Sequence, residues 1–104
     1  MNLSIIIPCL NEAETISQCI KKCFLSIEKM HIEAEIIIAD NGSSDGYIEI
    51  AQKLGAKVIN VEQKGYGSAI IGGITNAKGK YIIMGDCDDS YDFLEIEKFY
   101  NKLL

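Results

Sequence analysis

The sequence of 104 residues has no long hydrophobic run, no tryptophan and few basic residues. Its longest apolar run, near residues 5–10, is far shorter than the roughly 20 apolar residues that cross a bilayer. No basic segment precedes that run, so we expect no secretory signal. Lysine and arginine total 10 against 15 aspartates and glutamates, a formal net charge of −5. Without a basic stripe the composition argues against nucleic acid as a partner, but an anionic small ligand can still bind through a divalent cation.

Cysteine is present, but its pattern does not predict a disulfide framework. The chain has Cys9, Cys19, Cys23 and Cys87, and without a secretory signal we expect them to be reduced in the cytoplasm. Cys19 and Cys23 are four residues apart, which suits half a zinc site on a helix or an apolar helical stripe. We favour the stripe, because cysteine packs as a small hydrophobe. His31 is the only histidine, and we expect it in a connecting loop.

Four short apolar runs predict the strands of a parallel sheet. They are rich in β-branched residues and span residues 3–8, 35–40, 56–61 and 80–84. Apolar and polar residues do not alternate cleanly within them, which is typical of strands buried on both faces. A soluble α/β domain follows from this pattern.

Helical periodicity appears after the first and second runs. Asn11 and Glu14 form a capping-box pattern before the first helix. The second helix is expected to end at Gly55 in a left-handed cap. The predicted buried faces are Ile16, Cys19, Ile20, Cys23, Phe24 and Ile27 in the first helix and Ile50, Ala51 and Leu54 in the second.

Two further helices are predicted in the second half of the chain. One covers about residues 68–77, and its Gly72 and Gly73 permit a close approach to the sheet. The other begins near Asp92. Its predicted buried residues are Phe93, Ile96, Tyr100 and Leu103.

The alternation β-α-β-α-β-α-β-α predicts a doubly wound, open and mainly parallel Rossmann-like sheet, formed by one domain over residues 1–104. The strand order that we expect is 3-2-1-4. The last helix reaches Leu104 without a glycine stop, so we expect a domain truncated at its C-terminus.

Polar residues gather where the predicted strands end, which is where doubly wound sheets bind ligands. Glu12 follows the first strand, Asp40 ends the second, and the stretch MGDCDDSYDF at residues 84–93 follows the fourth. Four carboxylates in so short a stretch repel one another unless a cation or water separates them.

Asp86 and Asp88 share one side of an extended segment, and their carboxylate oxygens suit Mg²⁺ or Mn²⁺ rather than zinc. A cation held there would bind a diphosphate and stabilise it as a leaving group. The alternative is a solvated turn that caps the next helix, and an Asp-x-Asp pattern alone does not decide between the two. Lys64, in the loop after the third strand, either meets a phosphate or ribose or is simply solvated.

Three stretches together resemble the inverting family 2 glycosyltransferases of the GT-A fold, and among them the polyprenyl-phosphate and dolichol-phosphate sugar transferases. They are SIIIPCLNE, IIIADNGSSDG and KGYGSAIIGGITNAKGKYIIMGDCDDSYDF, and they cover nearly the whole chain. The resemblance implies a donor-binding half that holds a UDP- or GDP-linked sugar with Mg²⁺ or Mn²⁺. It implies inverting transfer to an acceptor such as a lipid phosphate.

The resemblance also implies roles for individual residues. The implied nucleotide-sugar-binding residues are Pro8, Leu10, Glu12, Asp40, Asp86 and Asp88. Among them Asp40 would bond the base, and Asp86 and Asp88 would be the metal ligands. Leu10 departs from the family, which often has an aromatic residue there. The catalytic base is implied to follow the last residue, so we expect this chain alone to bind donor without appreciable transfer.

Two other function classes stay open. A nucleotidyltransferase would need a glycine-rich, basic loop after the first strand, and residues 8–12 are neither. A phosphoacceptor or plain metal-binding module would need an acidic pocket at the first strand and a lysine on a fifth strand, and neither is evident. The resemblance implies a cytoplasmic enzyme, peripheral at the inner face of the membrane. An exposed fourth strand at the sheet edge predicts self-association.

Overall fold

Four parallel strands in the order β3-β2-β1-β4 form the centre of the structure. The computed structural model describes residues 1–9, 13–42, 46–85 and 96–104. The elements in chain order are β1 (Leu3–Cys9), α1 (Ala13–Met30), β2 (Ala34–Asp40), α2 (Tyr47–Lys53), β3 (Lys57–Asn60), α3 (Tyr66–Asn76), β4 (Tyr81–Met84) and α4 (Ile96–Leu103). The doubly wound α/β fold and the strand order predicted from the sequence are therefore confirmed.

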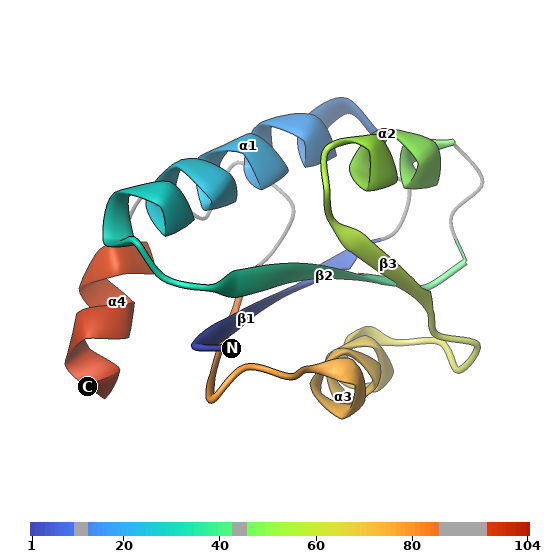
Figure 1. The fold of residues 1–104 in the computed structure, drawn as a ribbon. Helices are drawn as coiled ribbons and strands as arrows, with labels where there is room; N and C mark the ends of the chain where they lie inside the picture. Colours follow the sequence, from blue (N-terminus) through green and yellow to red (C-terminus); the bar gives the residue numbers. More distant parts are fainter. Residues whose placement is uncertain (10–12, 43–45, 86–95) are drawn as a thin grey trace.

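The main core lies on the face of the sheet that α1 and α2 cover (Figure 1). Leu3, Ile5 and Ile7 of β1 are fully buried there, together with Ile16 and Ile20 of α1. Burial of such side chains contributes roughly 1.5–3 kcal/mol each relative to exposure. This apolar contact holds α1 against β1 and β2.

Cys19 and Cys23 belong to this same core, as the apolar-stripe interpretation predicts. Within the described residues, both of them and Cys9 are buried thiols outside any disulfide. Cys87 lies outside the residues that the structure describes.

On the opposite face, α3 lies below the sheet by itself in the view of Figure 1. Its glycines permit this, as predicted. A Cβ added to Gly72 would lie 2.7 Å from Cγ2 of Val61, and one added to Gly73 would meet the side chain of Ile6. The backbone of α3 therefore packs directly on side chains of the sheet.

The prediction for α2 is partly wrong. Ala51 is buried and Gly55 has the expected left-handed conformation, with φ of 99°. Ile50, however, is 41% exposed, and Ile48 packs against the core instead. An α-helix has 3.6 residues per turn, so Ile48 and Ala51 share a face from which Ile50 points away.

The prediction for α4 also needs one correction. Ile96 and Tyr100 are buried, but Leu103 is 44% exposed. Tyr100 packs edge-on against Tyr81 with 6.1 Å between ring centroids, and Tyr81 is the first residue of β4. Leu103 is the last residue of α4 and follows the Tyr100 contact by three residues. The predictions for Asn11, Asp92 and Phe93 lie outside the described residues.

In the described parts of the chain, no helix combines the length and the apolar character that crossing a membrane requires.

Candidate functional site

The carboxyl ends of β1, β2 and β4 lie on one side of the sheet, which we call its carboxyl edge; the side where the strands begin is its amino edge. Cys9 is paired with Asp40 on β2, and Ile6 is paired with Met84 on β4. The backbone N–H of buried Gly85 donates to the carbonyl oxygen of Ile6 at 3.1 Å, which continues the ladder past the end of β4. The chain therefore leaves β4 beside β1, directly before the acidic stretch that begins at Asp86.

Two of the six predicted site residues fall within the described part of the chain. Pro8 is partly exposed and Asp40 is 4% exposed, and both lie at the carboxyl edge. Successive strand residues point to opposite faces, so Pro8 lies on the α3 face and Asp40 on the α1 face. The structure brings the two to the same edge from opposite sides. The predicted site residues outside the described part are Leu10, Glu12, Asp86 and Asp88.

Asn41, directly after β2, organises this edge of the sheet, and the sequence reasoning did not single it out. Its Nδ2 donates to the carbonyl oxygens of Val61 and Gln63, at 3.1 and 2.9 Å. Its Oδ1 accepts the backbone N–H of Gly65 at 2.8 Å. The side chain of Asn41 thus holds the loop between β3 and α3 against the end of β2.

Lys64 lies in that loop, and its ammonium group is drawn back to β2. Lys64 Nζ donates to the carbonyl oxygen of Asn41 at 2.7 Å. The nitrogen also lies over Gly42, where an added Cβ would meet it. Gly42 has a φ of 102°, a conformation that residues with a Cβ rarely adopt. Lys64 is exposed, so its positive charge lies at the carboxyl edge of the sheet, next to the end of β2.

In sequence, Asn41 and Gly42 are fully explained as turn residues, since Asn and Gly tolerate left-handed conformations. The partners of the Asn41 side chain lie 20 to 24 residues further along the chain. No local pattern indicates such bonds, although the polar residues after β2 and after β3 both point to this edge.

The part of the chain that is described holds no group of three or more His, Cys, Asp and Glu side chains able to bind a metal ion. The ligands predicted from the sequence, Asp86 and Asp88, are not among those residues. The metal site therefore stays a prediction.

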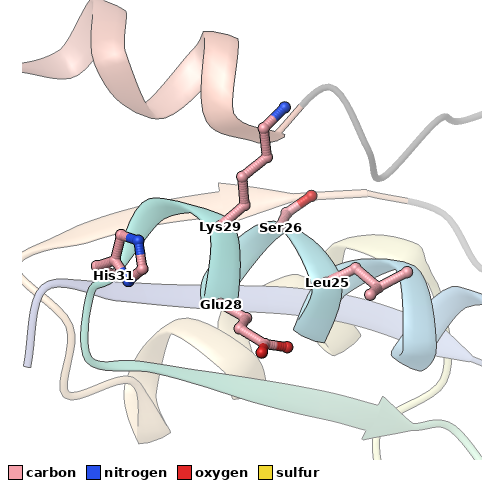
Figure 2. A pocket seen from close by; sticks show the side chains of 5 residues that line it. All are labelled: Leu25, Ser26, Glu28, Lys29 and His31. Carbon is pink, nitrogen blue, oxygen red and sulfur yellow. The ribbon is translucent and has the colours of Figure 1, made fainter.

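A separate hollow of about 620 Å³ lies at the C-terminal end of α1 (Figure 2). Its lining residues are Leu25, Ser26, Glu28, Lys29 and His31. Because α1 ends just before β2 begins, this hollow belongs to the amino edge of the sheet, opposite the predicted site. Lys29 extends towards α4 and pairs with Glu97 at 3.3 Å. His31 follows α1 in a turn, as expected from the sequence.

Residues 4–104 match the model of the family described as glycosyl transferase family 2. The match covers nearly the whole chain. The protein therefore belongs to glycosyl transferase family 2, which confirms the resemblance carried by its motifs.

Two curated relatives come from Haloferax volcanii. The chain is 43% identical over 99 residues to the low-salt glycan biosynthesis hexosyltransferase Agl6. This alignment covers 95% of the chain and 24% of the relative. It is 39% identical over 66 residues to a dolichyl-phosphate hexose transferase, covering 64% of this chain and 28% of that protein. The chain thus spans about a quarter of the length of these relatives. The second relative supports the polyprenyl-phosphate branch of the family.

Solved structures give the same result for the fold. Glucosyl-3-phosphoglycerate synthase from Mycobacterium tuberculosis, in complex with Mn²⁺, UDP and glucosyl-3-phosphoglycerate, matches with a TM-score of 0.81 and 26% identity. The same enzyme with Mg²⁺ and UDP also gives a TM-score of 0.81, at 25% identity. Each match covers 99% of this chain and 39% of the enzyme. The GT-A fold is therefore confirmed.

Proposed function

We propose that this chain binds the nucleotide-diphosphate sugar donor of a family 2 glycosyltransferase together with Mg²⁺ or Mn²⁺. The sugar would then pass, with inversion, to an acceptor. The observation that carries the proposal is the convergence of Asp40, Lys64 and the exit of β4 at one carboxyl edge. A similar fold that binds UDP with Mn²⁺ or Mg²⁺ supports it.

The base and ribose are assigned to residues at the ends of β1 and β2. Pro8, Leu10 and Glu12 would line them, and the carboxylate of Asp40 would accept a hydrogen bond from the base. The ammonium group of Lys64 would meet a phosphate or the ribose. Its exposure and its position beside the end of β2 support this role.

Asp86 and Asp88 are the residues proposed to hold the divalent ion. Two carboxylates suit a hard cation that prefers oxygen ligands. The bond between Gly85 and Ile6 brings the chain to the carboxyl edge one residue before Asp86. When bound, the ion would neutralise the diphosphate as it leaves the sugar.

The proposed acceptor is a polyprenyl phosphate, in keeping with the relative described as a dolichyl-phosphate hexose transferase. Such an acceptor would place the enzyme at the cytoplasmic face of a membrane as a peripheral protein. Transfer to a hydroxyl acceptor would in addition require a base that deprotonates it, and we assign that role to no residue of this chain.

Calorimetry with UDP, GDP and their sugar conjugates, with and without Mn²⁺, tests the proposal. We expect a nucleoside diphosphate to bind only in the presence of the metal ion. Preference for a nucleoside triphosphate would instead support a nucleotidyltransferase. Binding of Mn²⁺ with no nucleotide would support a metal-binding module, and either result would contradict the proposal.

A further inference from the structure

We propose that Asn41 is a positioning residue of the donor site, which fixes the loop at residues 61–65 and thereby sets the position of the Lys64 ammonium group. This inference rests on the proposed function and adds to it a residue that does not itself contact the ligand. It predicts that the loop after β3 and the end of β2 act as one unit.

Three hydrogen bonds tie the Asn41 side chain to this loop, and they use both of its donors. A primary amide offers two N–H donors and one carbonyl oxygen. Both donor bonds go to loop carbonyl oxygens, of Val61 and Gln63, and the oxygen accepts the N–H of Gly65. Asn41 is 8% exposed, so solvent offers little replacement for these bonds.

Lys64 depends on Asn41 in two ways. Its backbone lies between Gln63 and Gly65, which both bond the Asn41 side chain. Its Nζ donates to the carbonyl oxygen of Asn41 at 2.7 Å. The lysine side chain is a flexible four-carbon chain, and these two restraints limit where its charge can lie.

The same network also sets the beginning of α3. Gly65 immediately precedes α3, and its carbonyl oxygen accepts the N–H of Ala69 at 3.1 Å. The bond from the Gly65 N–H to Asn41 therefore links the first turn of α3 to the end of β2. Loss of Asn41 would loosen the loop and this first turn together.

An amide is needed here rather than a carboxylate. Aspartate has nearly the shape of asparagine, but its ionised side chain has acceptors only. In Asn41→Asp one carboxylate oxygen would face the carbonyl oxygens of Val61 and Gln63, which replaces two attractions by two repulsions. The variant separates bonding from side-chain volume.

The test compares wild type, Asn41→Ala, Asn41→Asp, Lys64→Met and the double variant Asn41→Ala/Lys64→Met. The Kd of UDP and of GDP is measured with Mn²⁺, and exchange of the Gly65 amide hydrogen is followed in the absence of ligand. We expect Kd to rise roughly tenfold in each single variant, as loss of one or two hydrogen bonds predicts. The double variant should bind no more weakly than Lys64→Met, because Asn41 acts through Lys64. Gly65 should exchange faster in both Asn41 variants.

Ser4→Ala is the matched control, since it breaks a similar network at the amino edge. The Ser4 hydroxyl donates to Glu35 Oε2 at 2.6 Å and accepts the N–H of Gly79 at 2.8 Å. This variant should be less stable but bind UDP as wild type does. Two outcomes would contradict the inference and leave the proposed function standing. In the first, wild type and Asn41→Ala bind a nucleoside diphosphate equally well. In the second, the losses of binding free energy in the two single variants add up in the double variant. If wild type binds none, the proposed function is wrong and the inference falls with it.

Discussion

Gly73 of α3 lies directly against Ile6 of β1, and a Cβ at Gly73 would meet Cγ2, Cγ1 and Cδ1 of the isoleucine. Ile6 is fully buried, so it has little room to move. The absence of a side chain at this position is what allows α3 to cover its face of the sheet. The loop that carries Lys64 leads into α3, so the packing of α3 on the sheet also affects where this loop lies.

We expect Gly73→Ala to lower the free energy of unfolding by ~1–3 kcal/mol, the usual cost of overpacking a core. Gly67→Ala, in the same helix, is the control because nothing lies within 4 Å of its added Cβ. Removing a glycine from a helix should leave stability unchanged or raise it by up to ~1 kcal/mol. Urea unfolding followed by circular dichroism measures both, and equal losses would contradict the packing argument.

The second prediction concerns Ser4, Glu35 and Gly79 at the amino edge. Ser4 is fully buried and joins Glu35 to the loop before β4, while Glu35 also accepts the backbone N–H of Lys78 at 2.7 Å. Ser4→Ala removes both bonds of a fully buried hydroxyl and leaves the partly buried N–H of Gly79 without its acceptor, which costs ~1–3 kcal/mol of unfolding free energy.

Asn76→Ala is a suitable comparison for Ser4→Ala, because its side-chain bond to Gly72 lies on an exposed helix surface. Exposed substitutions of this kind usually change stability by less than ~0.5 kcal/mol. Thermal unfolding of the two variants should therefore differ clearly. If Asn76→Ala lost as much stability as Ser4→Ala, burial of the Ser4 hydrogen bonds would not explain the loss in Ser4→Ala.

The third prediction tests the proposed metal ligands. Asp88→Asn and Asp86→Asn should each remove the Mn²⁺ dependence of UDP binding, because an amide is a weaker ligand for a hard cation than a carboxylate. The measurement is calorimetric titration of UDP at fixed Mn²⁺. Glu62→Gln is the charge-matched control, since Glu62 is exposed in the loop after β3. Retained metal-dependent binding in both aspartate variants would contradict the assignment.

The fourth prediction concerns Asp40, which ends β2 in a buried position. If its carboxylate accepts a hydrogen bond from the base, Asp40→Asn should weaken UDP binding roughly tenfold, or about 1.4 kcal/mol. Titration at a temperature where circular dichroism shows the variant folded separates binding from stability. Unchanged affinity in a folded variant would remove Asp40 from the donor site.

Much of the fold follows from local patterns in the sequence. The apolar, β-branched runs predicted all four strands to within one residue at each end. Burial on both faces explains the runs in the central strands β1 and β2. It was wrongly expected of the edge strands, because β3 has no buried residue and β4 has only Ile83. Gly55, Gly72 and Gly73 were predicted for the reasons that the structure confirms. Ile50 was misplaced because a helix as short as α2 contains too few apolar residues to define its buried face.

The candidate site was predicted only in part. Asp40 and Pro8 were placed correctly at the carboxyl edge, because a residue at the end of a parallel strand must lie there. Asn41 was missed, since its turn chemistry accounts for it locally while its bonding partners are more than a dozen residues away.

The order of strands and helices, the buried runs, the aspartate at the end of β2 and the acidic stretch after β4 were thus determined by the sequence itself. Short-range periodicity and the geometry of parallel strands are enough to produce them. Only the tertiary structure decided that the amide of Asn41 would hold the loop before α3 and that Lys64 would reach back to the end of β2. Those contacts depend on the distance between two loops, which is set by how β2 and β3 pair and not by any property of the residues alone.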